Sequence, residues 1–97
     1  MRRLAGTPFE LVFTKTAAKE FDRLAIRDAV AMRTALELLA RTGDGDIKVL
    51  EGAPDIFRLR VRQTRAEFTV VHRARSLTVI RVFYRQEGYK TKGRSRR

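Results

Sequence analysis

The sequence lacks the residues on which several kinds of site depend. It contains no cysteine and one histidine, His72. Without cysteine, a disulfide scaffold and thiolate zinc sites are excluded. No spacing of His, Asp and Glu is typical of a metal site either. We therefore expect neither a metal nor any other cofactor.

Long hydrophobic runs are also missing. The first residues, MRRLAGTPFELVF, begin with basic side chains but include no apolar segment of signal-peptide length. No later stretch is long enough to span a bilayer. We therefore expect a soluble, cytoplasmic protein that does not contact a membrane.

Acidic residues are scarce relative to basic ones. Lys and Arg total 22 against 11 Asp and Glu, which gives a net charge of +11, and 17 of the cations are arginine. The planar arginine fork matches phosphate oxygens, and neutralising phosphates favours nucleic-acid binding. A membrane surface or an acidic protein would also suit this charge, and a GC-rich genome would also raise the arginine count.

The length and composition predict one folded domain. The 97 residues suffice for a single core, and 43% of them are hydrophobic. Apolar residues become rare after Tyr89. We therefore predict a domain over residues 1–90 and a basic, mobile tail over 91–97.

The order of periodic segments predicts an α+β fold. A strand is expected at 9–13. It is followed by a helix through KTAAKEFDRL, whose N-cap is Thr14 or Thr16 with support from Glu20. A second helix is expected over 26–41, with Gly43 as its C-cap. Further strands are expected in IKVLE, IFRLRVR, RAEFTVVHR and LTVIRVFYR, with turns at GAPD and at 74–76. The prediction is a two-layer β-α-α-β-β-β domain, in which a helical hairpin covers one face of an antiparallel sheet.

The stretch IFRLRVRQTR alternates arginine with apolar residues. Because side chains of a strand point to alternate faces, the apolar residues face one way and the arginines the other. The apolar set is Phe57, Leu59 and Val61, and the arginine set is Arg58, Arg60 and Arg62.

The next two strands extend both faces. The expected core residues are Ala66, Phe68 and Val70, followed by Ile80, Val82 and Tyr84, and His72 also falls on the core side. The arginine face would gain Arg65, Glu67, Thr69, Arg81, Phe83 and Arg85. Six arginines on one face repel one another unless an anion binds there. Phe83 would offer a ring for stacking, and Glu67 a partner for Arg65. The alternative is a face that is merely solvated.

Three segments resemble the RelE/ParE superfamily of bacterial type II toxins. FRLRVRQTRAEF is similar to its YRLRVGDYRVIY-type segment, VIRVFYRQEGYK to its closing segment, and KVLEGAPDIFRLR to the approach to the central strand. The resemblance covers residues 9–90 and implies the RelE-like microbial RNase fold. It departs from the family at Arg62-Gln63, at Tyr84, where His is frequent, and at Glu51, where Lys is common.

RelE-type members cut mRNA in the ribosomal decoding site, and the resemblance implies a set of site residues. Arg65 and Arg85 would bind the scissile phosphate, with Arg85 donating toward the leaving oxygen, and Tyr89 would be the general base or a stacking group. A free tyrosine has a pKa of about 10, which neighbouring arginines would lower. The implied RNA-binding residues are Arg58, Arg60, Arg81, Phe83, Lys90 and Lys48.

The predicted function is therefore that of a toxin that cleaves mRNA on the ribosome without a metal and inhibits translation. Its expected partners are mRNA, ribosomal RNA and a cognate antitoxin with an acidic, amphipathic segment. Two alternatives remain: a ParE-like inhibitor of DNA gyrase that acts by protein binding, and a basic RNA-binding module without catalysis.

Overall fold

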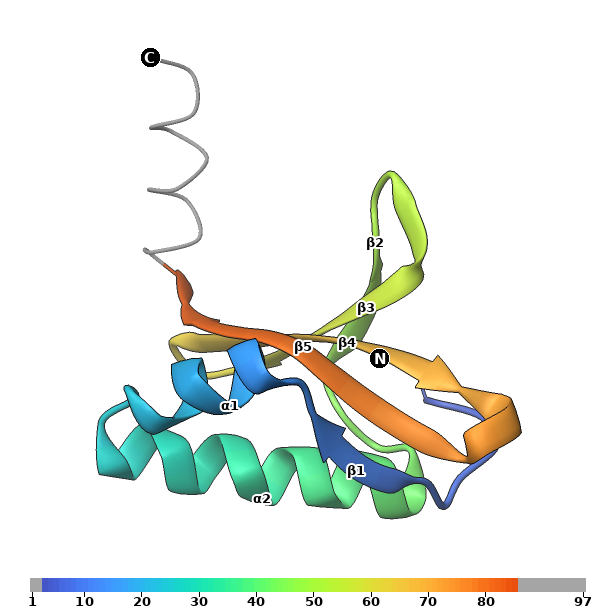
Figure 1. The fold of residues 1–97 in the computed structure, drawn as a ribbon, viewed down its shortest axis with the longest axis horizontal. Helices are drawn as coiled ribbons and strands as arrows, with labels where there is room; N and C mark the ends of the chain where they lie inside the picture. The colour runs from blue at the N-terminus through green and yellow to red at the C-terminus, as the bar shows by residue number, and fades with distance from the viewer. Residues whose placement is uncertain (1–2, 86–97) are drawn as a thin grey trace.

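The computed structural model describes residues 3–85, which form a five-stranded sheet with two helices against one face (Figure 1). The strand order across the sheet is β1-β5-β4-β3-β2. Along the chain the elements are β1 (Glu10–Phe13), α1 (Lys15–Asp22), α2 (Ile26–Thr42), β2 (Ile47–Leu50), β3 (Ala53–Val61), β4 (Thr64–Val71), the 3-10 turn η1 (His72–Ala74) and β5 (Ser76–Tyr84).

The predicted α+β, two-layer fold is confirmed, with one difference in the sheet. β2, β3, β4 and β5 pair antiparallel in succession, but β1 pairs parallel with β5. The sheet is therefore mixed. The parallel pair arises because β1 and β5 lie at opposite ends of the chain, so that no short hairpin has to join them.

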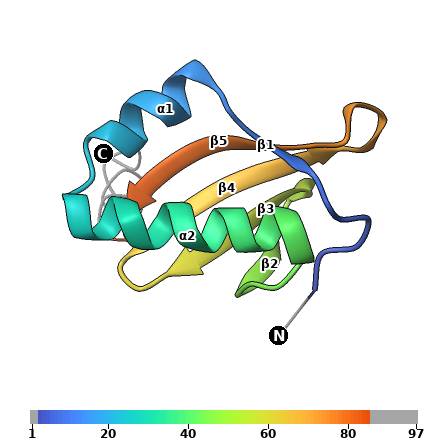
Figure 2. The same ribbon diagram turned by 90° about the horizontal axis from the view of Figure 1, so that it is seen from below.

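The core lies between the sheet and the helices. Met32, Leu36 and Leu39 of α2 are fully buried, as are Leu59 of β3 and Phe68 of β4. Figure 2 shows α2 lying across β3 and β4, while α1 follows β5. Neither helix covers the opposite face of the sheet.

Both expected helix caps are present. The hydroxyl of Thr14 accepts a hydrogen bond from the backbone N–H of Ala17 at 3.1 Å, which satisfies a free donor at the start of α1. Gly43 ends α2 in the left-handed conformation (φ 86°) and donates to the carbonyl of Leu39. Glu20 does not support the cap: its carboxylate accepts from the backbone N–H of Val82 in β5, at 2.8 Å.

A β-bulge in β5 alters the predicted faces. Phe68 lies opposite Val79, whereas the preceding Glu67 lies opposite Arg81, so Ile80 is an extra residue in β5. The extra residue reverses the alternation, so the core receives Leu77 and Val79 rather than Ile80. The prediction for Ile80 was therefore wrong, while Val82 is buried as expected.

Three loop positions also differ from prediction. The β2–β3 turn is at residues 51–52, and β3 begins within the expected turn at Ala53. Arg62 lies in the β3–β4 turn with φ 56° and so takes no place on the sheet face. His72 is exposed in η1, where its ring makes a T-shaped contact with the ring of Phe9, so its predicted core-side position was wrong.

Candidate nucleic-acid interface

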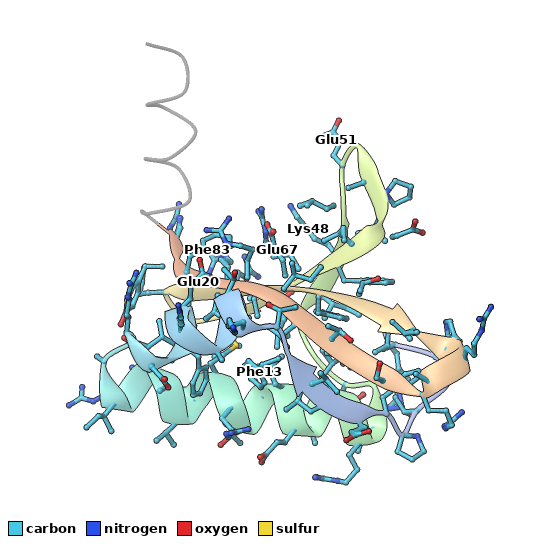
Figure 3. The ribbon with its side chains drawn as sticks, viewed as in Figure 1. Phe13, Glu20, Lys48, Glu51, Glu67 and Phe83 are labelled. Atoms are coloured by element: carbon cyan, nitrogen blue, oxygen red, sulfur yellow. The ribbon has the colours of Figure 1, made fainter. Side chains whose placement is uncertain are left out.

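One row of charged side chains crosses the sheet on the face away from the helices. Cross-strand pairing places Lys48 beside Arg58, Arg58 beside Glu67, and Glu67 beside Arg81. Figure 3 shows Lys48, Glu67 and Phe83 on this side, with Lys48 on the β2–β3 hairpin, which stands out from the sheet. The strand register alone thus brings four charged residues together.

A cavity of about 270 Å³ opens beside this row. Its lining residues come from β2, β3, β4, the residue before β2 and the residue after β5. Its lining residues are Asp46, Lys48, Arg58, Arg60, Arg65 and Arg85. Five cationic side chains therefore share a space of roughly the size of a small ligand, with one carboxylate among them.

Arg58 is held firmly in the wall of this cavity. Its Nη2 donates to Oε2 of Glu67 at 2.8 Å, and the two side chains are only 26% and 17% exposed. The guanidinium also lies over the ring of Phe83, 5.7 Å from its centroid. Its Nε is buried without a hydrogen-bond partner among the described residues. Glu67 therefore orients Arg58, whereas the sequence predicted that it would pair with Arg65.

Arg60 has a partner of another kind. Its Nε and Nη2 both lie 2.6 Å from Oδ2 of Asp46, and the side chains are 62% and 47% exposed. The backbone N–H of Arg60 also donates to the carbonyl of Asp46 at 3.0 Å. This pair thus sits at the rim of the cavity, in contact with solvent.

Arg65 and Arg85 approach the cavity from the end of the sheet near the β3–β4 turn. Nη1 of Arg65 donates to the carbonyls of Arg62 at 3.0 Å and Thr64 at 2.8 Å. The backbone N–H of Arg85 donates to the carbonyl of Gln63 at 2.8 Å. The turn therefore positions both arginines beside the same space.

Phe83 and Arg81 lie on the predicted face of the sheet, but other residues engage both side chains there. Phe83 is 8% exposed, because the guanidinium groups of Arg58 and Arg81 cover its ring, the latter at 5.2 Å. An open ring for base stacking is therefore not present, and the prediction for Phe83 was wrong in this respect. Arg81 pairs with Glu20 of α1 at 2.9 Å and is not among the residues that line the cavity.

The predicted crowd of six arginines is thus divided. Arg62 is in a turn and Arg81 lies beside α1, which leaves four arginines and Lys48 around the cavity. Asp46 carried no prediction, and Glu20 was predicted only to support a helix cap, yet both pair with arginines from other elements. One sequence signal would have indicated Asp46. It is a carboxylate directly before β2, the strand that pairs with β3.

Tyr84 packs against the core as predicted, and its hydroxyl makes two contacts that the sequence did not predict. Its hydroxyl donates to Asp28 Oδ2 at 2.8 Å and accepts from the backbone N–H of Ala25 at 2.9 Å. It therefore ties the end of β5 to the start of α2, directly before Arg85. Tyr89, Lys90 and the predicted tail lie outside the described residues.

Residues 3–85 contain neither a metal-binding cluster nor a membrane-spanning helix. No group of three or more His, Cys, Asp or Glu side chains in this range could hold a metal ion. No helix in the same range has the length and apolar content needed to cross a membrane.

The fold was compared with known proteins. No family model and no curated protein matches the sequence. Among solved structures, the chain is similar to a RelBE toxin–antitoxin complex from Mycobacterium tuberculosis (TM-score 0.71, 22% identity, covering 87% of this chain and 98% of that one). It is also similar to a RelB–RelE complex from Methanococcus jannaschii (TM-score 0.68, 22% identity, covering 80% of this chain and 94% of that one). A third similar structure is the intact Escherichia coli RelBE complex (TM-score 0.63, 25% identity, covering 78% of this chain and 95% of that one). The chain therefore has the fold of the RelE toxins of type II toxin–antitoxin systems.

Proposed function

We propose that this protein is the toxin of a type II toxin–antitoxin system and a ribosome-dependent endoribonuclease that cleaves mRNA in the decoding site. The observation that carries the proposal is the cavity on a RelE-like fold, where Lys48 and four arginines converge from three strands and the end of a fourth. Such a cluster suits the phosphates of a nucleic-acid backbone.

The proposed reaction needs no metal. The 2′-oxygen attacks the adjacent phosphorus, a bond forms between them, and the bond from phosphorus to the 5′-oxygen breaks. The products are a 2′,3′-cyclic phosphate and a 5′-hydroxyl. A base takes the proton from the 2′-hydroxyl, an acid supplies one to the 5′-oxygen, and cations stabilise the charge on the phosphorane.

The cavity residues would divide this work. We assign the scissile phosphate to Arg65 and Arg85, which both line the cavity and both hydrogen-bond to carbonyls of the β3–β4 turn. Arg85 would also donate toward the leaving 5′-oxygen. Arg58, Arg60 and Lys48 would bind the neighbouring phosphates. Tyr89, beyond the described residues, is the proposed general base.

This constellation supplies strong anion binding but weak acid–base catalysis. The residues that line the cavity in the described part of the chain are cations and Asp46, which is ion-paired with Arg60. Most of the rate would then come from the positioning of the mRNA. A ribosome that presents the mRNA in a bent, attack-ready geometry would supply it, which is why we propose that cleavage depends on the ribosome.

A cognate antitoxin is the second proposed partner. The three similar structures named above are all complexes with an antitoxin. The chain itself carries a net charge of +11. An acidic antitoxin segment would complement that charge and block the cavity. We propose that this protein meets both the ribosome-bound mRNA and the antitoxin in the cytoplasm.

The proposal is tested with purified ribosomes that hold a defined mRNA and an empty decoding site. We expect cleavage in that site by the wild-type protein and none of the same mRNA without ribosomes. Arg65→Ala and Arg85→Ala should each lower the single-turnover rate about 10²- to 10³-fold, because each removes a donor to the developing charge. Arg73→Ala is the control, since Arg73 is exposed in η1 and does not line the cavity.

Two results would overturn the proposal. Intact mRNA on ribosomes, together with accumulated gyrase–DNA breaks, would favour a ParE-like gyrase inhibitor. Cleavage by Arg85→Ala at the wild-type rate would remove the proposed site.

A further inference from the structure

Asp46 is the one carboxylate among the described residues that line the cavity, and it occupies an anion position. Two N–H groups of the Arg60 guanidinium converge on its Oδ2, each at 2.6 Å. Convergent donors of this kind also bind a phosphate oxygen. The position of Oδ2 therefore marks where Arg60 would hold a phosphate.

The two ion pairs of the arginine strand differ in how readily they can exchange. The Arg58–Glu67 pair is largely buried, and breaking it would leave a charge without a partner in the sheet. The Arg60–Asp46 pair is about half exposed, so water can take over from either partner. Arg58 is thus held by its carboxylate, whereas Arg60 can leave Asp46 for another anion at low cost.

The surroundings favour such an exchange. Lys48, Arg65 and Arg85 line the same cavity. A phosphodiester carries the same single negative charge as Asp46, and it has two oxygens that several cations can share. The Asp46 carboxylate is tethered to the main chain, so it can accept hydrogen bonds from few of these cations.

We propose that Arg60 forms a phosphate subsite that Asp46 fills in the free protein, and that a phosphodiester of single-stranded RNA displaces the Asp46 carboxylate. The choice of RNA as the ligand rests on the proposed function. Asp46 then lowers the affinity of the cavity for RNA in two ways: it competes for Arg60, and it repels the bound phosphate. Only a ligand that also engages the other cations would gain enough to displace it.

The test is binding of a fluorescent 2′-O-methyl RNA hexamer, which cannot be cleaved because its 2′-oxygens are blocked. Asp46→Asn is compared with Glu51→Gln, which removes the same charge from the exposed tip of the β2–β3 hairpin, outside the cavity (Figure 3). We expect Asp46→Asn to bind about two- to fivefold more tightly than Glu51→Gln, which corresponds to an exposed ion pair. The same substitution in an Arg60→Ala background should give a smaller gain, because only the repulsion between Asp46 and the bound phosphate is then relieved.

Three results would overturn the inference: equal affinities of Asp46→Asn and Glu51→Gln, a full gain from Asp46→Asn without Arg60, or no measurable binding of the hexamer by wild type and Asp46→Asn. The assay is independent of catalysis. If Asp46→Asn shows the expected gain but ribosomal mRNA stays intact, the subsite stands and the proposed endonuclease does not.

Discussion

At the scale of single residues, the cavity arginines differ mainly in their partners. Arg58 is enclosed by a buried carboxylate and an aromatic ring, while Arg60 shares an exposed carboxylate at the rim. Arg65 is braced by two backbone carbonyls. A guanidinium that is already oriented loses less side-chain entropy when it binds a phosphate. We therefore regard Arg58 and Arg65 as the preorganised part of the site.

The role of Glu67 can be tested through stability. Glu67→Gln keeps the size of the side chain but leaves the positive charge of Arg58 in a poorly hydrated position. We expect a loss of about 1–3 kcal/mol in the free energy of unfolding, below the range for a fully buried pair because both side chains are partly exposed. Urea unfolding measures it. Asp46→Asn, which breaks the exposed pair of Arg60, should change the same quantity by less than about 0.5 kcal/mol. Equal effects of the two substitutions would show that Glu67 does not hold Arg58 as described.

The strand period predicted which face a side chain of β3 takes, but not which partner it contacts. Alternation predicted that Arg58 and Arg60 share a face, because the period of a strand is independent of its surroundings. It did not predict that Phe83 lies under two guanidinium groups or that Asp46 meets Arg60. Those contacts depend on strand register and on the path of the loop over residues 43–46, which no local pattern specifies.

At the scale of elements, the β5 bulge decides which side chains reach the interface. Before the bulge, Leu77 and Val79 face the helices, and after it Val82 does. Arg81 and Phe83 can therefore lie on the opposite face only because Ile80 is an extra residue. A bulge leaves no clear mark in a β-branched run such as LTVIRV, so the sequence predicted the strand but placed Ile80 on the wrong face.

The end of α2 leaves no room for a side chain at Gly43. Gly43 has φ 86°, and a Cβ at this residue would lie 2.3 Å from the carbonyl oxygen of Leu4. We expect Gly43→Ala to lower the free energy of unfolding by about 2–4 kcal/mol, from the left-handed backbone together with the clash. Urea unfolding is again the measurement.

Gly52, at the tip of the β2–β3 hairpin, separates the two causes. It has a similar φ of 82°, but a Cβ there would have nothing within 4 Å. Gly52→Ala should therefore cost only about 1 kcal/mol, the penalty for the backbone conformation alone. If the two substitutions were equally destabilising, the contact between the end of α2 and Leu4 would not be as described.

At the scale of the whole molecule, composition indicates a class of partner but does not locate a site. The net charge of +11 is consistent with a polyanionic ligand wherever the cations lie. The fold gathers five of them around one cavity and pairs others with carboxylates elsewhere, as Arg81 with Glu20 and Arg3 with Asp44. The order of helices and strands predicted the fold class, because each element had its own periodicity.

The charge of the cavity predicts a strong dependence of RNA binding on salt. Each phosphate neutralised on a single strand contributes about −0.7 to the slope of log K against log salt concentration. With five cations in the cavity, we expect a slope of about −3 or steeper for the 2′-O-methyl hexamer. Arg65→Ala should make it shallower by about 0.7, and Arg73→Ala should leave it unchanged. A slope near zero, or equal slopes for these two variants, would contradict binding through the cavity.

The central claim, that this protein cuts mRNA on translating ribosomes through the arginine cavity, is tested most directly in cells. Expression is induced, and mRNA 5′ ends are mapped across the transcriptome with and without an inhibitor that blocks translation initiation. We expect new 5′ ends within coding regions that keep a reading-frame periodicity. These ends should disappear when initiation is blocked and when Arg85 is replaced by alanine. New ends that persist without translation, or growth arrest without new ends, would contradict it.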